Sequence, residues 1–191
     1  LVFFDKVPFQ NGFTKVCVAD EQAARIAAAA LINSRRKRIL SLFGDMQMSI
    51  SKRRHDTYIQ VFDEHSLSDE LIVDFATSAD EARQRVFLAF GKTEQPQAIF
   101  CMSDEILIGT MKAIQMMELK VPDEIALIAI SNGFFPKLYH PEITYVETSG
   151  YKLGKLAFDR MIAYIQGRRE PEELIVESVL VQGGSLLTDQ E

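Results

Sequence analysis

Cysteine is scarce in this chain, and long apolar segments are absent. Its only two cysteines, Cys17 and Cys101, lie inside apolar, strand-like segments. This placement is typical of buried thiols in a reducing compartment and not of a disulfide framework. No apolar run approaches the roughly 18 residues that cross a membrane, and no secretory signal is present. We therefore expect a cytoplasmic protein without membrane contact.

An excess of positive charge is also lacking. The chain has 21 Lys and Arg residues against 27 Asp and Glu residues, which gives a net charge of −6. Because neutralising phosphates requires a basic surface, we do not expect this chain to hold nucleic acid by itself. The basic run at residues 35–38 is interpreted as an exposed helix end, where cations are favourable.

Residue patterns that support catalysis are missing as well. The three histidines, His55, His65 and His140, share no metal-ligand spacing with the cysteines. The ten glycines are mostly single, and neither a phosphate loop nor a Gly-x-Ser-x-Gly motif occurs. We expect no catalytic residue, no metal and no cofactor.

What is present is a clear strand–helix–strand unit over residues 97–132. Residues 97–102 form a short apolar run after a proline, and residues 125–130 are wholly apolar, as strands buried on both faces are. Between them, Ser103 is placed to cap a helix that ends before Pro122. A helix joining two such strands indicates a parallel pair, whose ligand crevice lies beyond the carboxyl ends of the strands.

Strands and helices alternate along the rest of the chain, which indicates an α/β fold with mainly parallel sheets. Asp20 is expected to cap the alanine-rich helix at 21–33. Polar breaks near residue 44 and residues 131–141 suggest two sheets. We expect further helices at residues 52–64, 79–90 and 149–166, and further strands at residues 1–4, 15–18, 39–43, 71–75, 143–146, 174–176 and 179–181. The strand at 1–4 is expected to be buried. The apolar residues expected on the buried sides of the three helices are Tyr58, Val61 and Phe62, then Ala82, Val86 and Ala89, and then Leu153, Leu156, Ala157, Met161, Ile162 and Ile165.

The order of several short motifs resembles the effector-binding domain of the lactose-repressor (LacI/GalR) family of bacterial transcription regulators. The resemblance extends from residue 1 to about residue 185 and depends on order and spacing, since each motif alone is weak. The matching pieces are VFFDK at 2–6, the helix at 23–32 with the strand that ends in Gly44, RRHDTY at 53–58, residues 97–109, VPDEIALI at 121–128 and HPEITYV at 140–146.

The resemblance implies the periplasmic binding protein-like type I fold, with two Rossmann-like subdomains, three crossovers and a ligand cleft between the subdomains. The first subdomain would comprise residues 1–44 plus 144–176, and the second residues 45–132 plus 179–191. A complete family member begins with a helix-turn-helix DNA-binding head and the first strands and helices of subdomain one. Because the chain opens abruptly on a strand, we expect an incomplete effector domain that something precedes.

The resemblance also marks residues that would contact an effector. Arg54 matches an arginine that hydrogen-bonds the effector in this family, and a guanidinium suits hydroxyls or a carboxylate. Arg53 and His55 are interpreted as surface residues. Phe75 matches a position where an aromatic ring stacks on the ligand, although a core phenylalanine fits equally well. Asp104 matches an adjacent aspartate, for which structural work in the first helical turn is favoured.

Five further positions complete the predicted effector site. Ser103 lies where the family often has a ligand-contacting asparagine, and a helix cap is compatible with that role. Ser131 replaces an aspartate common in sugar-binding members, and its single uncharged hydroxyl argues against a simple sugar. Thr148 lies at a crossover and can face the cleft, although a hinge role is favoured. Asp5 and Lys6 end the first strand beside the crevice, unless they form a salt bridge with each other.

These inferences predict the ligand-sensing domain of a LacI-type transcriptional regulator. Its effector would be a small polar molecule such as a sugar or sugar derivative, and operator DNA would be bound through the missing N-terminal helix-turn-helix of a homodimer. The alternative is a periplasmic sugar-binding transport receptor with the same fold, although the motif at 121–126 favours the regulator. An enzyme on a doubly wound fold is disfavoured because the chain lacks a catalytic constellation.

Overall fold

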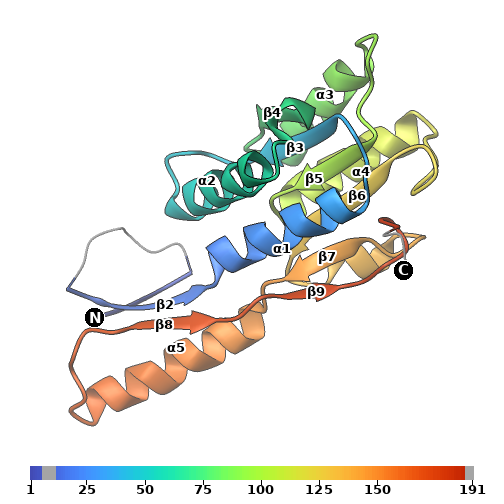
Figure 1. The fold of residues 1–191 in the computed structure, drawn as a ribbon. Helices are drawn as coiled ribbons and strands as arrows, with labels where there is room; N and C mark the ends of the chain where they lie inside the picture. Colours follow the sequence, from blue (N-terminus) through green and yellow to red (C-terminus); the bar gives the residue numbers. More distant parts are fainter. Residues whose placement is uncertain (6–11, 188–191) are drawn as a thin grey trace.

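A computed structural model describes residues 1–5 and 12–187 of the chain. It contains two sheets of unequal size that lie end to end (Figure 1). The chain passes between the sheets at Ala19, at residues 148–149 and at residues 177–178. All strand pairs are parallel except the last one in the larger sheet, so the expected α/β fold is confirmed.

The larger sheet has six strands and helices on both faces (Figure 1). Helices α1 (Asp20–Asn33) and α2 (Ser49–Glu64) pack against each other on one face. Helices α3 (Ala79–Phe90) and α4 (Asp104–Met116) pack together on the other face. The strand order is β4 (Leu71–Phe75), β3 (Ile39–Phe43), β5 (Ala98–Cys101), β6 (Ala126–Ser131), β7 (Thr144–Glu147) and β9 (Val179–Val181).

Apolar periodicity explains why these segments adopt these structures. Every residue of β5 and β6 is buried, as expected for central parallel strands covered on both faces. Helix α3 has the predicted bounds, and its predicted stripe of Ala82, Val86 and Ala89 is buried. The main core therefore lies between this sheet and its two helical layers.

The smaller sheet has three strands, β1 (Val2–Phe4), β2 (Thr14–Val18) and β8 (Glu173–Val176), and is covered by α5 (Gly150–Ile165). Its buried cluster contains only Val16, Val18, Leu153 and Val176. The expected burial of β1 is wrong, because β1 is an edge strand and Phe4 is 60% exposed.

The strand pairing differs from the predicted division of the chain at two strands. The sequence placed β3 and β7 in the first subdomain, whereas both pair inside the six-stranded sheet. The chain leaves the small sheet already at Ala19, so α1 lies against α2, β6, β7 and β9. The apolar strand β3 pairs with β4 and β5 inside the larger sheet. The break after Gly44 is therefore a loop at the carboxyl end of β3 and not a boundary between the two sheets.

The remaining elements are two short 3-10 turns at Ser68–Glu70 and Phe135–Leu138. Among the residues that the structure describes, no helix combines the length and the apolar character that a membrane span requires.

Candidate functional site

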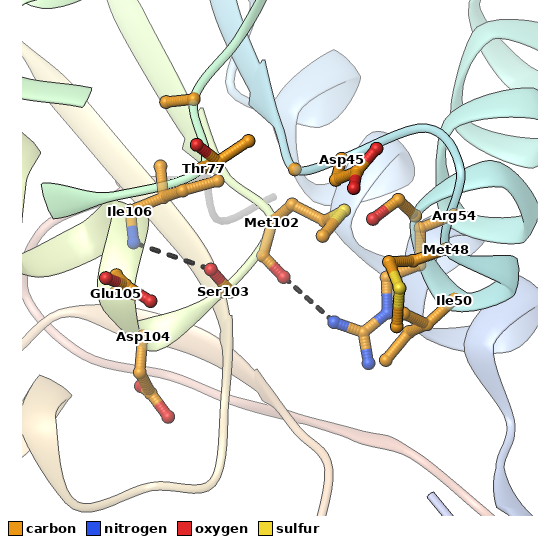
Figure 2. A pocket seen from close by; sticks show the side chains of 13 residues that line it. Asp45, Met48, Ile50, Arg54, Thr77, Met102, Ser103, Asp104, Glu105 and Ile106 are labelled. Carbon is orange, nitrogen blue, oxygen red and sulfur yellow. Dashed lines mark hydrogen bonds between the residues drawn. The ribbon is translucent and has the colours of Figure 1, made fainter. Parts of the chain in front are cut away.

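A pocket of about 370 Å³ opens at the carboxyl ends of β3, β4 and β5 (Figure 2). Helices α2 and α4 begin at this edge, so their first turns contribute to its walls. This is the position at which parallel α/β sheets generally bind ligands. The polar residues that line the pocket are Asp45, Ser51, Arg54, Thr77, Ser103, Asp104 and Glu105.

Arg54 forms one wall of the pocket from the second turn of α2. Its side chain is buried, with 4% of the residue exposed. Nε and Nη2 each lie 2.9 Å from Oδ1 of Asp20, and Nη1 donates to the carbonyl of Met102 at 2.9 Å. The guanidinium has N–H groups beyond those used in these contacts. Arg54 therefore lies at the predicted crevice, but the carboxylate of Asp20 already balances its charge.

Asp20 is a site residue that the sequence analysis interpreted differently. It was expected to cap α1, but it is the first residue of that helix, and Ala19 occupies the cap position without a side-chain bond. Burial raises the pKa of the Asp20 carboxyl, and the charge and hydrogen bond of Arg54 oppose that shift. No local pattern indicated this role, because Asp20 and Arg54 are separated by 34 positions in the chain.

The end of β6 holds Asp104, an acidic residue of the pocket lining, in place. Ser131 is only 2% exposed and is not part of the pocket lining. Its hydroxyl donates to Oδ1 of Asp104 and accepts a hydrogen bond from the backbone N–H of Gly133 at 3.0 Å. The N–H of Asn132 donates to Oδ2 of Asp104 at 3.2 Å. The lining residue that is bonded to the end of β6 is thus Asp104.

Ser103 and Phe75 lie at the same edge of the larger sheet but differ in placement: Phe75 is the last residue of β4, and Ser103 follows β5. Ser103 lines the pocket, and its Oγ accepts from the N–H of Ile106 at 3.4 Å, so it also caps α4. Phe75 is 41% exposed at the end of β4, and its ring lies 6.0 Å from that of His55 and 6.5 Å from that of Phe43. Phe75 is not among the residues that line the pocket.

Two further predicted site residues, Thr148 and Asp5, lie at a crossover and beside the small sheet. The N–H and hydroxyl of Thr148 donate to the carbonyl of Ser131 at 2.9 Å and 3.3 Å, a geometry that suits a hinge. Asp5 is exposed, with a left-handed backbone (φ 64°), and follows β1 on the small sheet. Lys6 lies outside the described residues.

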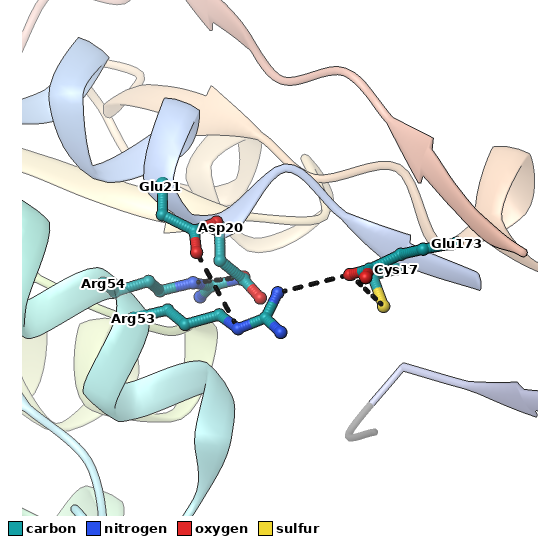
Figure 3. Close-up of polar contacts among 6 residues, drawn as sticks. All are labelled: Cys17, Asp20, Glu21, Arg53, Arg54 and Glu173. Atoms are coloured by element: carbon teal, nitrogen blue, oxygen red, sulfur yellow. Dashed lines mark hydrogen bonds and ion pairs between the residues drawn. The ribbon is translucent and has the colours of Figure 1, made fainter. Parts of the chain in front are cut away.

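Arg53 links the two sheets, although it was interpreted as a surface residue. Its Nη1 lies 3.6 Å from Oε1 of Glu173 on β8, and its Nε lies 3.8 Å from Oε1 of Glu21 on α1 (Figure 3). The thiol of Cys17 lies 4.0 Å from the same oxygen of Glu173. Burial, followed by the charge of Glu173, raises the pKa of Cys17 to about 11. Arg53 therefore joins α2 to the small sheet directly beside Arg54.

Metal ligation is not visible in this arrangement. Within residues 1–5 and 12–187, no group of three or more His, Cys, Asp or Glu side chains is positioned to hold a metal ion.

Comparisons with known proteins agree with this geometry. Residues 28–186 match the family described as periplasmic binding protein-like domain. The transcriptional regulator TreR of Escherichia coli (strain K12) is 27% identical over 173 residues, which cover 89% of this chain and 52% of TreR. The transcriptional repressor PurR of Vibrio vulnificus (strain CMCP6) is 22% identical over 175 residues, which cover 91% of this chain and 52% of PurR. The chain thus spans about half the length of these curated relatives.

Solved structures show the same fold. A LacI family transcriptional regulator from Enterococcus faecium with bound ribose aligns with a TM-score of 0.89 and 16% identity, over 99% of this chain and 71% of that chain. A dimeric Lac repressor with an 11-residue C-terminal deletion aligns with a TM-score of 0.89 and 19% identity, over 99% of this chain and 69% of that chain.

These matches cover most of the chain. They confirm the resemblance to the effector-binding domain of LacI/GalR regulators, and the chain belongs to the family of periplasmic binding protein-like domains.

Proposed function

We propose that this chain is the ligand-sensing domain of a LacI-type DNA-binding transcriptional regulator. Its effector would be a small polar molecule, a sugar or sugar derivative, bound in the pocket at the carboxyl ends of β3, β4 and β5. The observation that carries the proposal is the buried Arg54, which lines this pocket at the position predicted for an effector-binding arginine.

The polar groups of the pocket suit a ligand with several hydroxyl groups. Arg54 offers N–H donors, while Asp45, Asp104 and Glu105 offer carboxylate acceptors. Each sugar hydroxyl both donates and accepts a hydrogen bond, so it matches a wall that mixes donors and acceptors. Because Asp20 balances the charge of Arg54, the pocket has no surplus positive charge, which favours a neutral ligand over an anionic one.

The contacts around the pocket also suggest how binding is communicated. Asp20, the partner of Arg54, is the first residue after one crossover. Thr148, at a second crossover, is bonded to the end of β6. A ligand that contacts Arg54 or the end of β6 would therefore have different affinities for different arrangements of the two sheets. Such a difference in affinity is the requirement for a ligand-driven switch.

In this proposal the regulator acts in the cytoplasm as a homodimer and binds operator DNA through an N-terminal helix-turn-helix. The named relatives are transcriptional regulators, which favours the regulator over a transport receptor.

Calorimetric titration of the protein against a panel of neutral and phosphorylated sugars, with D-ribose among them, tests the proposal. We expect a neutral sugar to bind and Arg54→Ala to lower its affinity at least about tenfold, because a buried charged donor is lost. Arg54→Lys keeps the charge beside Asp20 but loses the fork, so it tests the same contact with less damage to folding. Lys52→Ala, an exposed cation on the same helix, is the matched control and should bind as the wild type does. If no sugar binds, or if a bound sugar is indifferent to both Arg54 variants, the proposed site is wrong.

A further inference from the structure

We infer that Asp104, positioned by Ser131, is the acceptor that selects the hydroxyl pattern of the ligand. This inference rests on the proposed function, since it specifies how the same pocket recognises a sugar. It differs from the sequence-based prediction, in which Ser131 itself contacts the effector and Asp104 has a structural role.

The first argument is accessibility. Ser131 is 2% exposed and lies outside the pocket lining, whereas Asp104 is half-buried and belongs to the lining. Strand β6, which ends at Ser131, is paired with β5, and α4 begins directly after β5 with Asp104. Among the residues that line the pocket, Asp104 is therefore the one bonded to the end of β6, and a ligand contact from this strand end would pass through its side chain.

The second argument is the direction of the hydrogen bonds. The N–H of Gly133 donates to Oγ of Ser131, so this hydroxyl uses its own hydrogen for Oδ1 of Asp104. The backbone N–H of Asn132 donates to Oδ2. Both carboxylate oxygens are thus held from the same strand end. A carboxylate oxygen accepts more than one hydrogen bond, so each retains capacity for a ligand hydroxyl.

The third argument is a comparison with another acid of the pocket. Asp45 is exposed in a turn, where its Oδ1 accepts from the N–H of Gln47 at 2.9 Å. Asp104, in contrast, is fixed at both oxygens by a neighbouring strand. A group that is already held in its bound geometry loses little freedom on binding and discriminates more strongly between ligands. Arg54 on α2 and Asp104 on α4 lie on opposite sides of Met102 and Ser103 (Figure 2), so they would contact different parts of a ligand.

The test combines protein variants with ligand analogues. Calorimetry would compare D-ribose and its 2-deoxy, 3-deoxy and 5-deoxy analogues on the wild type, Asp104→Asn and Ser131→Ala. We expect Asp104→Asn to weaken D-ribose about 30-fold, since a charged acceptor is lost, and Ser131→Ala to weaken it about threefold to fivefold. For the analogue that lacks the contacted hydroxyl, the wild type and both variants should bind equally.

A purely structural role of Asp104 predicts a different pattern, in which all four sugars weaken by the same factor or none weakens. Either result overturns the inference. Asp80→Asn, an exposed acid in the first turn of α3 at the same edge of the sheet, is the matched control and should leave all affinities unchanged. Should Asp104→Asn fail to fold, Ser131→Ala gives the same hydroxyl-specific comparison. If the wild type binds none of these sugars or their relatives in the panel, the proposed function fails, and this inference fails with it.

Discussion

The two sheets differ in how completely they bury their apolar residues. The six-stranded sheet has helices on both faces and central strands without exposed residues, and it carries the pocket. The three-stranded sheet has a small buried cluster, and its helix α5 leaves Ile165 69% exposed. The predicted apolar stripe of α5 is therefore only partly confirmed. An apolar stripe predicts a helix well, but its burial depends on how much sheet lies opposite.

The largest difference should come from two substitutions to alanine on helices that cover the two sheets, one at a buried residue of α2 and one at an exposed residue of α5. Phe62→Ala removes a ring with no exposed surface, and we expect it to lower the free energy of unfolding by about 3–5 kcal/mol. Ile165→Ala on α5 should change it by less than about 0.5 kcal/mol. Urea denaturation followed by circular dichroism measures both. Similar costs for the two variants would contradict the contrast between the sheets.

A second comparison uses two adjacent arginines. Arg54→Ala leaves the buried Asp20 without its charged partner and should destabilise the protein by about 3 kcal/mol or more. Arg53→Ala removes longer, more exposed contacts to Glu21 and Glu173 and should cost less than about 1 kcal/mol. Thermal unfolding of the two variants under the same conditions gives the ranking, and the reverse order would show that the burial of Arg54 is misassigned.

The two thiols report on local opening of each sheet. Burial raises the pKa of Cys17 to about 11 and that of Cys101 to about 12, so both are protonated and unreactive at pH 8 in the closed structure. Cys17 belongs to the small sheet, which we expect to open at a lower free energy. Labelling of Cys17 should be at least about tenfold faster than labelling of Cys101. This ratio corresponds to a difference of about 1.4 kcal/mol in the free energy of local opening.

Labelling with a disulfide reagent, followed by mass spectrometry, separates the two sites. Cys17→Ser and Cys101→Ser provide single-thiol controls. Equal rates would indicate that both sheets open together.

The smallest effect should be the coupling across the sheets between Arg53 and Glu173. A double-mutant cycle with Arg53→Glu and Glu173→Arg should give a coupling of about 0.5 kcal/mol, because the pair is partly exposed. High salt should reduce this value. The exposed pair Lys155–Asp159 within α5 is the control, since its removal leaves the contact between the sheets intact. A zero coupling at low salt would mean that Arg53 does not connect them.

Local signals in the sequence predicted much of the fold. The bounds of α3 and β4, the cap of α4 at Ser103 and the inward side of α2 all follow from apolar spacing and capping residues. The distribution of strands between the sheets was not predictable in the same way. β3 is apolar on both faces, which indicates a central strand but does not identify its neighbours.

The candidate site shows the same division. The sequence by itself determined the alternation of strands and helices, the edge at which a ligand would bind and the residue types available there, since these depend on neighbours within a few positions. Only the tertiary structure decided that Asp20 is the partner of the buried Arg54, and that Ser131 is bonded to Asp104. Those outcomes depend on contacts between segments 27 or more positions apart, which local spacing does not encode.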